Sequence, residues 1–366
     1  MPEKVSQPDR PLGEDMVQTR RDMVAGAACA SIWLAGNRAA QAAPSQALIN
    51  AAKAEGKVVW YTGMIVKQLV RPLVEAFGAK YGIELKYATA GDSETVLKLT
   101  SQARARRMEA DVFDSPGTAI PPLTKAGLIE PFAPSGAAKY DAKFRPPSRI
   151  YTAMYALYLT TAYNTARVKP DEAPRTYNDL LDPKWKGRMV WTDTRGISGP
   201  PGFIGNILKT MGQEKGMAYL SKLAQQKIVR DPGNQRVVLD KVIAGQFAIG
   251  LMTYNHHAVI SKDRGAPVAW VKMEPLVANL GVIALVKNAP RPNAAKLFLE
   301  YLVSDEGQKI IREAGYPPAD PDVTAKDPSI SPATGKFSTT LLAPEISSQD
   351  SEPLASWLKI YDQMFK

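Results

Sequence analysis

The chain of 366 residues contains one cysteine and two histidines. Cys29 belongs to an N-terminal segment that we expect to be removed, so the mature protein would have no disulfide, thiolate metal site or cysteine nucleophile. The histidines, His256 and His257, are adjacent, and no carboxylate–histidine cluster has metal-site spacing. The segment 196–200 (G-I-S-G-P) lacks the final glycine of a G-x-S-x-G nucleophile turn. We therefore expect no enzyme, and an exported hydrolase is the alternative from another class.

Long apolar runs and concentrated basic blocks are also missing. After residue 42 no run of about 18 apolar residues occurs, so no membrane-spanning helix is predicted. The net charge of +10 comes from Lys and Arg residues spread along the chain, without the basic block and interleaved aromatics of a nucleic-acid-binding protein. Two interpretations of this charge stay open. It forms a solvated surface, or it attracts an anionic solute or an acidic membrane partner.

The first 42 residues have the pattern of an export signal. Arg20 and Arg21 precede an apolar, small-residue stretch, 23–36, and residues 40–42 (A-Q-A) form a cleavage site. The stretch is too short to span a bilayer. We predict a twin-arginine signal peptide over residues 1–42 and a periplasmic mature protein. The alternative is an amphipathic leader helix of a cytoplasmic protein.

Strand-like and helix-like segments alternate from residue 58 onward. Runs of β-forming residues at 58–61, 83–87 and 111–113 are separated by segments with apolar residues at helical spacing. The second of these helices would be capped by Asp92 or Ser93. This β-α-β-α-β order predicts an α/β fold whose parallel sheet has helices on both faces.

A second α/β run follows the Pro-rich segment 145–147. Its expected strands are 190–191, 247–252 and 280–285, and its expected helices are 201–211, 217–224, 236–244, 294–303 and 305–314. Residues 316–333 are rich in Pro, Asp, Ser and Ala and predict a loop, whereas 352–365 predict a final amphipathic helix. Two α/β halves leave a cleft where strand ends and helix N-termini converge.

Six segments carry a family resemblance: 59–63 (V-W-Y-T-G), 110–113 (A-D-V-F), 162–164 (A-Y-N), 177–187 (Y-N-D-L-L-D-P-K-W-K-G), 294–298 (A-A-K-L-F) and 304–308 (S-D-E-G-Q). On these residues the chain resembles bacterial extracellular solute-binding proteins of the ferric-binding type, which serve ABC importers. The resemblance covers about residues 57–316. It implies a periplasmic-binding-protein-like fold, in which two α/β lobes with mixed sheets close on a ligand between them.

The resemblance also implies how the chain is divided and what it binds. We expect lobe 1 over 43–149 plus 272–316, lobe 2 over 150–271, and a C-terminal tail and helix, 317–366, that pack on the lobes. The expected partners are a small-molecule solute and an ABC membrane permease. No cofactor and no nucleic acid are expected, and the protein would be a monomer.

Iron-binding members of this family hold ferric ion with a His or Tyr after the first strand, a Glu after the third, and a Tyr-Tyr pair near the second-lobe strand. The matching positions here hold Ile65, Pro116, Tyr254 and Asn255. One phenolate and a neutral amide do not compensate a trivalent cation, and a phenol with a pKa of about 10 needs such a cation to ionise. We therefore expect no ferric binding of the family's kind, and ferric ion is the alternative ligand.

Loops suited to an anion lie at four predicted strand ends: 91–93, 115–118, 192–202 and 231–235. The third would place unpaired amides and Arg195, a bidentate donor for carboxylate or phosphonate, before a helix. For each loop, the alternative is an ordinary capped turn without a ligand. For Trp191, which could flank an organic ligand, the alternative is packing in the core. We predict a small organic anion (carboxylate, phosphonate or phosphate ester) bound beside Tyr254. The expected ligand-binding residues are Tyr61, Asp92, Ser93, Ser115, Thr194, Arg195, Gly196, Ser198, Asn234, Tyr254 and Asn255.

The export route can be tested on the arginine pair. Replacing both Arg20 and Arg21 with lysine is expected to leave the precursor in the cytoplasm, because the twin-arginine route depends on that pair. Cell fractionation and immunoblotting would separate the precursor from the mature protein. Unimpaired export of the double variant would point to the general secretion route instead.

Overall fold

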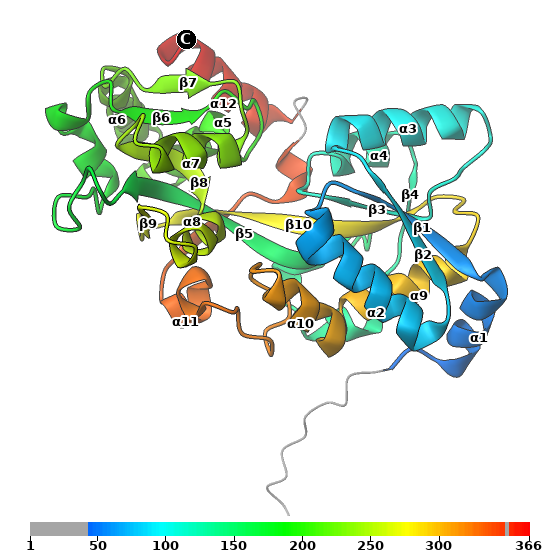
Figure 1. Ribbon diagram of the computed structural model, residues 1–366. Helices are drawn as coiled ribbons and strands as arrows, with labels where there is room; N and C mark the ends of the chain where they lie inside the picture. The colour runs from blue at the N-terminus through cyan, green and yellow to red at the C-terminus, as the bar shows by residue number, and fades with distance from the viewer. Residues whose placement is uncertain (1–42, 348–350) are drawn as a thin grey trace, which may run out of the picture. The chain divides into compact units, whose positions relative to one another are not determined.

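Two long antiparallel strands, β5 (Thr152–Asn164) and β10 (Leu276–Val286), form the middle of an 11-stranded sheet in the computed structural model (Figure 1). The structure describes residues 43–347 and 351–366. Every residue of both strands is buried. The other strands are β1 (Lys57–Thr62), β2 (Glu84–Thr89), β3 (Val112–Ser115), β4 (Ile129–Glu130), β6 (Met189–Thr192), β7 (Val229–Asp231), β8 (Ile249–Tyr254), β9 (Val268–Val271) and β11 (Thr339–Leu341).

The sheet has two parallel flanks joined by an antiparallel centre. Its order is β2-β1-β3-β10-β5-β8-β6-β7, and β4 and β11 pair with β10 while β9 pairs with β5. The β1–β2 and β1–β3 pairs are parallel on one flank, and the β6–β7 and β6–β8 pairs are parallel on the other. Each flank needs helices on both faces, so the chain builds two α/β lobes around the shared strands.

Twelve α-helices cover these flanks among the described residues. They are α1 (Gln46–Glu55), α2 (Arg71–Tyr81), α3 (Asp92–Arg104), α4 (Ile120–Lys125), α5 (Pro200–Met211), α6 (Gln213–Ala224), α7 (Gln235–Ile243), α8 (Asn255–Asp263), α9 (Pro292–Leu302), α10 (Asp305–Glu313), α11 (Pro332–Gly335) and α12 (Glu352–Met364). Short 3-10 or π-helical turns lie at 66–70, 135–139, 142–144, 177–181, 183–185, 328–330 and 344–347.

The predicted alternation is confirmed for β1–β3 and for the helices between them. The longest strand, β5, was not predicted from the sequence. Both of its faces are buried, so it has no polar alternation that would mark it as a strand. Parts of 316–333 also differ from the predicted loop, because they form a short helical turn and enter α11.

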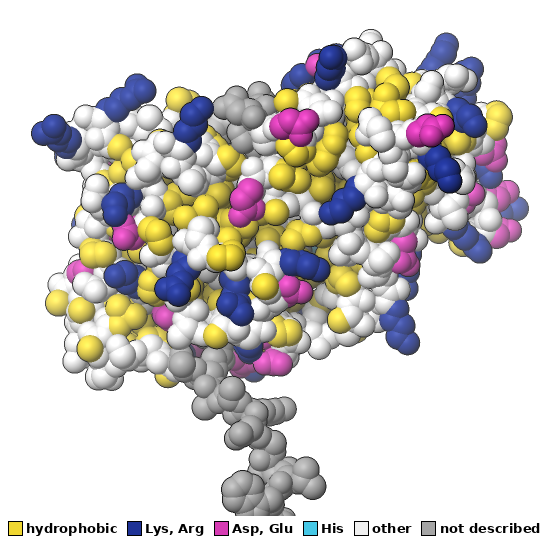
Figure 2. All heavy atoms as spheres, turned by 180° about the vertical axis from the view of Figure 1, so that it is seen from behind, with side chains coloured by type: hydrophobic (Ala, Val, Ile, Leu, Met, Phe, Trp, Pro, Cys, Tyr) yellow, Lys and Arg dark blue, Asp and Glu magenta, His cyan; other side chains and the backbone are white. Residues whose placement is uncertain are grey.

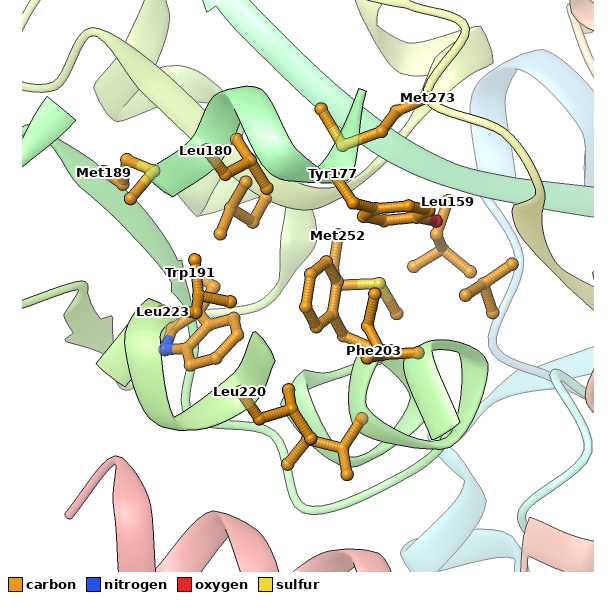
Figure 3. Close-up of a cluster of buried hydrophobic side chains, with 14 of the residues drawn as sticks. Leu159, Tyr177, Leu180, Met189, Trp191, Phe203, Leu220, Leu223, Met252 and Met273 are labelled. Atoms are coloured by element: carbon orange, nitrogen blue, oxygen red, sulfur yellow. The ribbon is translucent and has the colours of Figure 1, made fainter. Parts of the chain in front are cut away.

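The second lobe packs around an aromatic and methionine-rich core (Figure 3). Trp191 of β6 is fully buried there, with its ring 6.0 Å from those of Phe203 and Tyr361 and 4.9 Å from that of Phe365. Offset and edge-to-face packing of this kind adds to the apolar burial. Trp191 is therefore a core residue, which was the alternative to a ligand contact in the sequence analysis.

The C-terminal segment contacts both lobes. Ser347 donates a hydrogen bond to the carbonyl of Gly117 in the first lobe at 2.9 Å. Beyond the undescribed residues 348–350, α12 packs on α5, where a Cβ added to Gly205 would lie 2.6 Å from the ring of Trp357. Only glycine permits this close approach of the two helices.

Lys and Arg side chains lie scattered over the face shown in Figure 2 rather than in one block. In the part of the chain that the structure describes, none of the helices is long and apolar enough to cross a membrane.

A buried ion pair ties the first-lobe strands to α9. Asp111 precedes β3 and is fully buried. It accepts hydrogen bonds from the amide of Val59 at 2.7 Å and from Nε and the amide of Arg291 at 2.7 and 2.9 Å. One carboxylate therefore joins β1, β3 and the start of α9.

Removing the charge of Asp111 should destabilise the fold. Asp111→Asn leaves Arg291, whose side chain is 14% exposed, without its counter-charge, and we expect a loss of about 3 kcal/mol in unfolding free energy. Urea denaturation measures this loss. The control is Asp240→Asn, whose exposed pair with Arg236 on α7 is expected to contribute less than about 0.5 kcal/mol. Equal losses of unfolding free energy in both variants would contradict a stabilising role of the buried Asp111–Arg291 pair.

Candidate functional site

A pocket of about 660 Å³ lies where the two lobes meet. The first lobe contributes residues of the α3 N-terminus and of the segment around α4, and the second contributes the turn after β6. The lining residues are Asp92, Ser93, Val96, Leu97, Thr118, Pro122, Thr194, Arg195, Gly196 and Ser347. The lobes nearly touch here, since a Cβ on Gly196 would lie 3.9 Å from Cγ2 of Thr118. Five of the predicted binding residues therefore share one pocket.

On the first-lobe side, the carboxylate of Asp92 fills the turn after β3. Its Oδ2 accepts hydrogen bonds from Oγ of Ser115 at 2.7 Å, from Oγ1 of Thr118, and from the amide of Ala119 at 3.1 Å. Burial raises the pKa of Asp92, and these hydrogen bonds oppose the rise. Asp92 or Ser93 was expected to cap α3, but Gly91 occupies the cap position, and the side chain of Asp92 reaches across to the α4 turn.

Two buried acceptors lie behind this turn. Asp114, at the end of β3, accepts the amide of Gly63 through Oδ1 at 3.3 Å. Its Oδ2 has no hydrogen bond of good geometry among the described residues, although the side chains of Thr62 and Trp60 lie beside the carboxyl group. Burial raises the pKa of Asp114 to about 7, and these two side chains oppose the rise. Asn279 on β10 donates from Nδ2 to Oγ of Ser198 at 2.7 Å, and its Oδ1 likewise lacks a described partner. Sequence reasoning missed both residues, whose only signal is a polar side chain within a buried strand.

On the second-lobe side, the turn 194–198 lies tightly against the start of α5. A Cβ on Gly199 would lie 2.1 Å from the carbonyl oxygen of Thr194, and one on Gly202 would lie 1.8 Å from that of Ile197. Both positions need glycine, since no side chain fits at these distances. The two glycines therefore hold the shape of the turn.

The unpaired amides lie in this turn and not at the helix start. Pro200 and Pro201 have no N–H, and the amides of Gly199 and Gly202 donate at 3.0 Å to Gly196 and Gly199 carbonyls. The first residues of α5 therefore offer no free amides to a ligand. Within the described residues, no acceptor is bonded to the amides of 195–198, so consecutive donors remain open beside the pocket.

Arg195 lines the pocket and is paired with the C-terminal helix. Its guanidinium donates two hydrogen bonds to the carboxylate of Asp362, at 2.8 and 2.9 Å, and both side chains are 39% exposed. Arg195 and Lys366 hold the pKa of Asp362 below its ordinary range. The neighbouring Tyr361 donates to Oδ1 of Asp193. Two adjacent residues of α12 thus fix the turn that carries Arg195.

Tyr254, at the end of β8, faces the first lobe. Its phenol is hydrogen-bonded to Ser198, and burial raises its pKa, with a further rise from the negative charge of Asp92. Asp92 belongs to the opposite lobe, so its charge acts on Tyr254 across the lobe boundary. Ser115, Ser198 and Tyr254 therefore lie around the pocket wall rather than in the pocket lining.

Three predicted residues serve other contacts. Tyr61 packs in the first-lobe core and accepts a hydrogen bond from Nε2 of Gln102 at 2.7 Å. Asn234 caps α7 through Oδ1, which accepts the amides of residues 236 and 237 at 3.0 and 3.1 Å. Asn255 is fully buried and donates to the carbonyl of Ile330 at 3.0 Å. The structure does not bring these three into the pocket.

The two histidines follow Tyr254 on α8. Burial lowers the pKa of His256 well below its ordinary value and that of His257 to about 4, so both are neutral at pH 7. Neither ring nitrogen of His256 has a partner among the described residues. Over the same residues, no group of three or more His, Cys, Asp or Glu has the arrangement of a metal site.

The profile of bacterial extracellular solute-binding proteins matches residues 72–336. The chain belongs to this family. The Fe(3+)-binding periplasmic protein of Serratia marcescens is 25% identical over 275 residues, which cover 72% of this chain and 78% of that protein. A putative 2-aminoethylphosphonate-binding periplasmic protein of Salmonella typhimurium is 24% identical over 273 residues, covering 71% and 77%.

Solved structures show the same fold. A Trichodesmium protein in complex with iron and citrate aligns with a TM-score of 0.70 at 23% identity, covering 84% of this chain and 99% of that one. Together these matches place the solute-binding protein among the ferric-binding-protein-like, periplasmic components of ABC importers, which confirms the family resemblance and the two-lobe fold.

The exposure of the Arg195–Asp362 pair limits what it contributes to stability. A double-mutant cycle with Arg195→Gln and Asp362→Asn is expected to give a coupling energy of about 0.5–1 kcal/mol, because solvent screens both partners. Thermal or urea unfolding of the four proteins measures it. A coupling above about 2 kcal/mol would mean that Arg195 is locked to α12 and not free to turn to a ligand.

Proposed function

We propose that this solute-binding protein captures a small organic anion, a carboxylate, phosphonate or phosphate ester, between its lobes and delivers it to an ABC permease. The observation that carries the proposal is the turn 195–198, whose amides have no acceptor among the described residues and whose residues Arg195 and Gly196 line the pocket. Successive backbone N–H groups in a turn form a concave, partly positive surface that suits an anion. The glycines at 199 and 202 hold this turn in place.

Side chains around the turn add to this donor set. The hydroxyls of Thr194 and Ser198 lie on the same turn, and Arg195 lines the pocket. The pair with Asp362 is exposed, so an incoming anion competes for the guanidinium at little cost. The net charge of +10 raises the local concentration of anions near the protein.

The remaining walls suit the carbon skeleton of such a ligand. Val96 and Leu97 of α3 line the pocket, and Leu97 is 71% exposed. A ligand that touches α3 and the 194–198 turn together binds the closed arrangement of the lobes better than an open one, and this difference drives closure. Tyr254, behind the turn, would support the ligand's body.

The relatives support this ligand class in part. One is named for a phosphonate, and one solved structure holds citrate, a carboxylate, together with iron. Ferric ion is the second candidate, because several relatives are iron-binding proteins and because hard oxygens gather near the lobe boundary. The phenols of Tyr155, Tyr254 and Tyr316 lie close enough to Asp92 or Asp114 for these charges to raise their pKa values.

Burial acts against the ferric alternative in the absence of metal. It raises the pKa of Tyr254, and that of Tyr316 to about 12, so both phenols stay protonated unless a cation ionises them. Asn255, in place of a second phenolate, turns away to Ile330. We therefore place the organic anion first.

The export route, the oligomeric state and the cofactor content of the protein are also proposed. The predicted twin-arginine signal, residues 1–42, lies outside the described residues. Periplasmic relatives are consistent with export, and we propose the twin-arginine pathway, a monomer and no cofactor.

A thermal-shift screen of carboxylates, phosphonates and phosphate esters tests the ligand class. A ligand at a hundredfold excess over its Kd is expected to stabilise the protein by about 2.7 kcal/mol. Thr194→Asp adds a negative charge to the exposed turn and should weaken the best hit at least about tenfold, whereas Thr194→Asn, of the same shape, should not.

Two results would contradict the proposal of an organic anion. Stabilisation by cations or neutral sugars alone would reject the anion. A visible charge-transfer band on titration with iron, lost in Tyr254→Phe, would establish the ferric alternative instead.

A further inference from the structure

We propose that the captured solute is a zwitterion, with a primary ammonium group facing Asp92 of the first lobe and its anionic end at the 195–198 turn of the second. This inference rests on the proposed function and narrows its ligand class. It follows from the opposite chemistry of the two pocket walls.

The first-lobe wall offers no place for a second anion. The donors of the turn after β3, the hydroxyls of Ser115 and Thr118 and the amide of Ala119, are already directed to Oδ2 of Asp92. An internal carboxylate thus takes the position that an anionic ligand would need. A ligand anion placed there would meet a like charge in a partly buried site, which is unfavourable.

Asp92 keeps capacity for a donor from the ligand. Three hydrogen bonds converge on Oδ2, whereas each carboxylate oxygen accepts about two, so Oδ1 is the oxygen with room for a further donor. Among the lining residues, Asp92 and Arg195 are the charged side chains, and they stand on opposite lobes. The pocket is therefore negative on one wall and donor-rich on the other.

Two buried acceptors behind the wall supply an independent observation. Asn279 is fully buried, and its carboxamide faces the second-lobe turn, because Nδ2 is bonded to Ser198 while Oδ1 has no described partner. Asp114 is 4% exposed, and its Oδ2 has no hydrogen bond of good geometry among the described residues, with Thr62 and Trp60 beside it. The antiparallel register, Ser115 opposite Val282, carries Asn279 alongside the turn that follows β3.

These open groups match an ammonium and not a hydroxyl or a second acid. A protonated primary amine has three donors and no acceptor. Asp92 lines the pocket on the first-lobe side, and the buried oxygens of Asp114 on β3 and Asn279 on the shared strand β10 keep accepting capacity behind it. Charge-assisted hydrogen bonds between an ammonium and carboxylates are the strong kind. Burial of Asp114 also means that a cation beside it relieves an unfavourable site.

The test compares probes that differ only in the amine. Calorimetric titration of the mature protein with 2-aminoethylphosphonate against ethylphosphonate, and with β-alanine against propionate, should show the aminated member binding about 10- to 100-fold more tightly. Asp92→Asn keeps the shape and should bring the two members of each pair to within about threefold. The control Glu94→Gln, on the same helix with an exposed partner Lys98, should leave the preference unchanged.

Each outcome decides the matter. Equal binding of aminated and amine-free probes, or an unchanged preference in Asp92→Asn, would overturn the zwitterion while leaving the anion proposal intact. Failure of all four probes would reject both the zwitterion and these anion classes. If Asp92→Asn unfolds, Asp114→Asn takes its place: a reduced preference supports the inference, and an unchanged one overturns it.

Discussion

The pairing of β5 with β10 is the constraint on which both lobes depend. The two strands are buried along their whole lengths and carry the parallel flanks of the sheet on either side. Each flank alone would expose an edge of unpaired backbone groups and an apolar face. Because the strands are shared, the lobes meet at fixed strand ends, and the turns after β3 and β6 are brought to one pocket.

Two carboxylates of the protein pair with the donors around the pocket. Asp92 satisfies the donors of the first-lobe turn, and Asp362 holds Arg195 of the second. The polar groups that still lack a partner then indicate where a ligand binds, since buried polar groups without partners are uncommon in folded proteins. Open amides on one wall and an acidic group on the other are the basis of the two-ended ligand that we propose.

Sequence reasoning succeeded where a pattern is local. The alternation over 58–113 predicted β1 to β3 with their helices, and five of the residues predicted to bind ligand, Asp92, Ser93, Thr194, Arg195 and Gly196, line one pocket. It failed where the cause lies far along the chain. Asp92 reaches residue 119, and the partner of Arg195 is 167 residues away, so neither contact has a sequence signature. Tyr61, Asn234 and Asn255 have suitable side chains, but neighbouring contacts turn them elsewhere.

The packing of α12 against the second lobe also has an optical consequence. Trp191 precedes the pocket turn by three residues and packs edge-to-face against Tyr361, which is hydrogen-bonded to Asp193, and Trp357 lies against α5. Trp191 is therefore tied, through Tyr361 and Asp193, to the turn that lines the pocket. A shift of this turn on binding is expected to change the fluorescence of Trp191 against the background of the other tryptophans, so that occupancy can be followed without an attached dye.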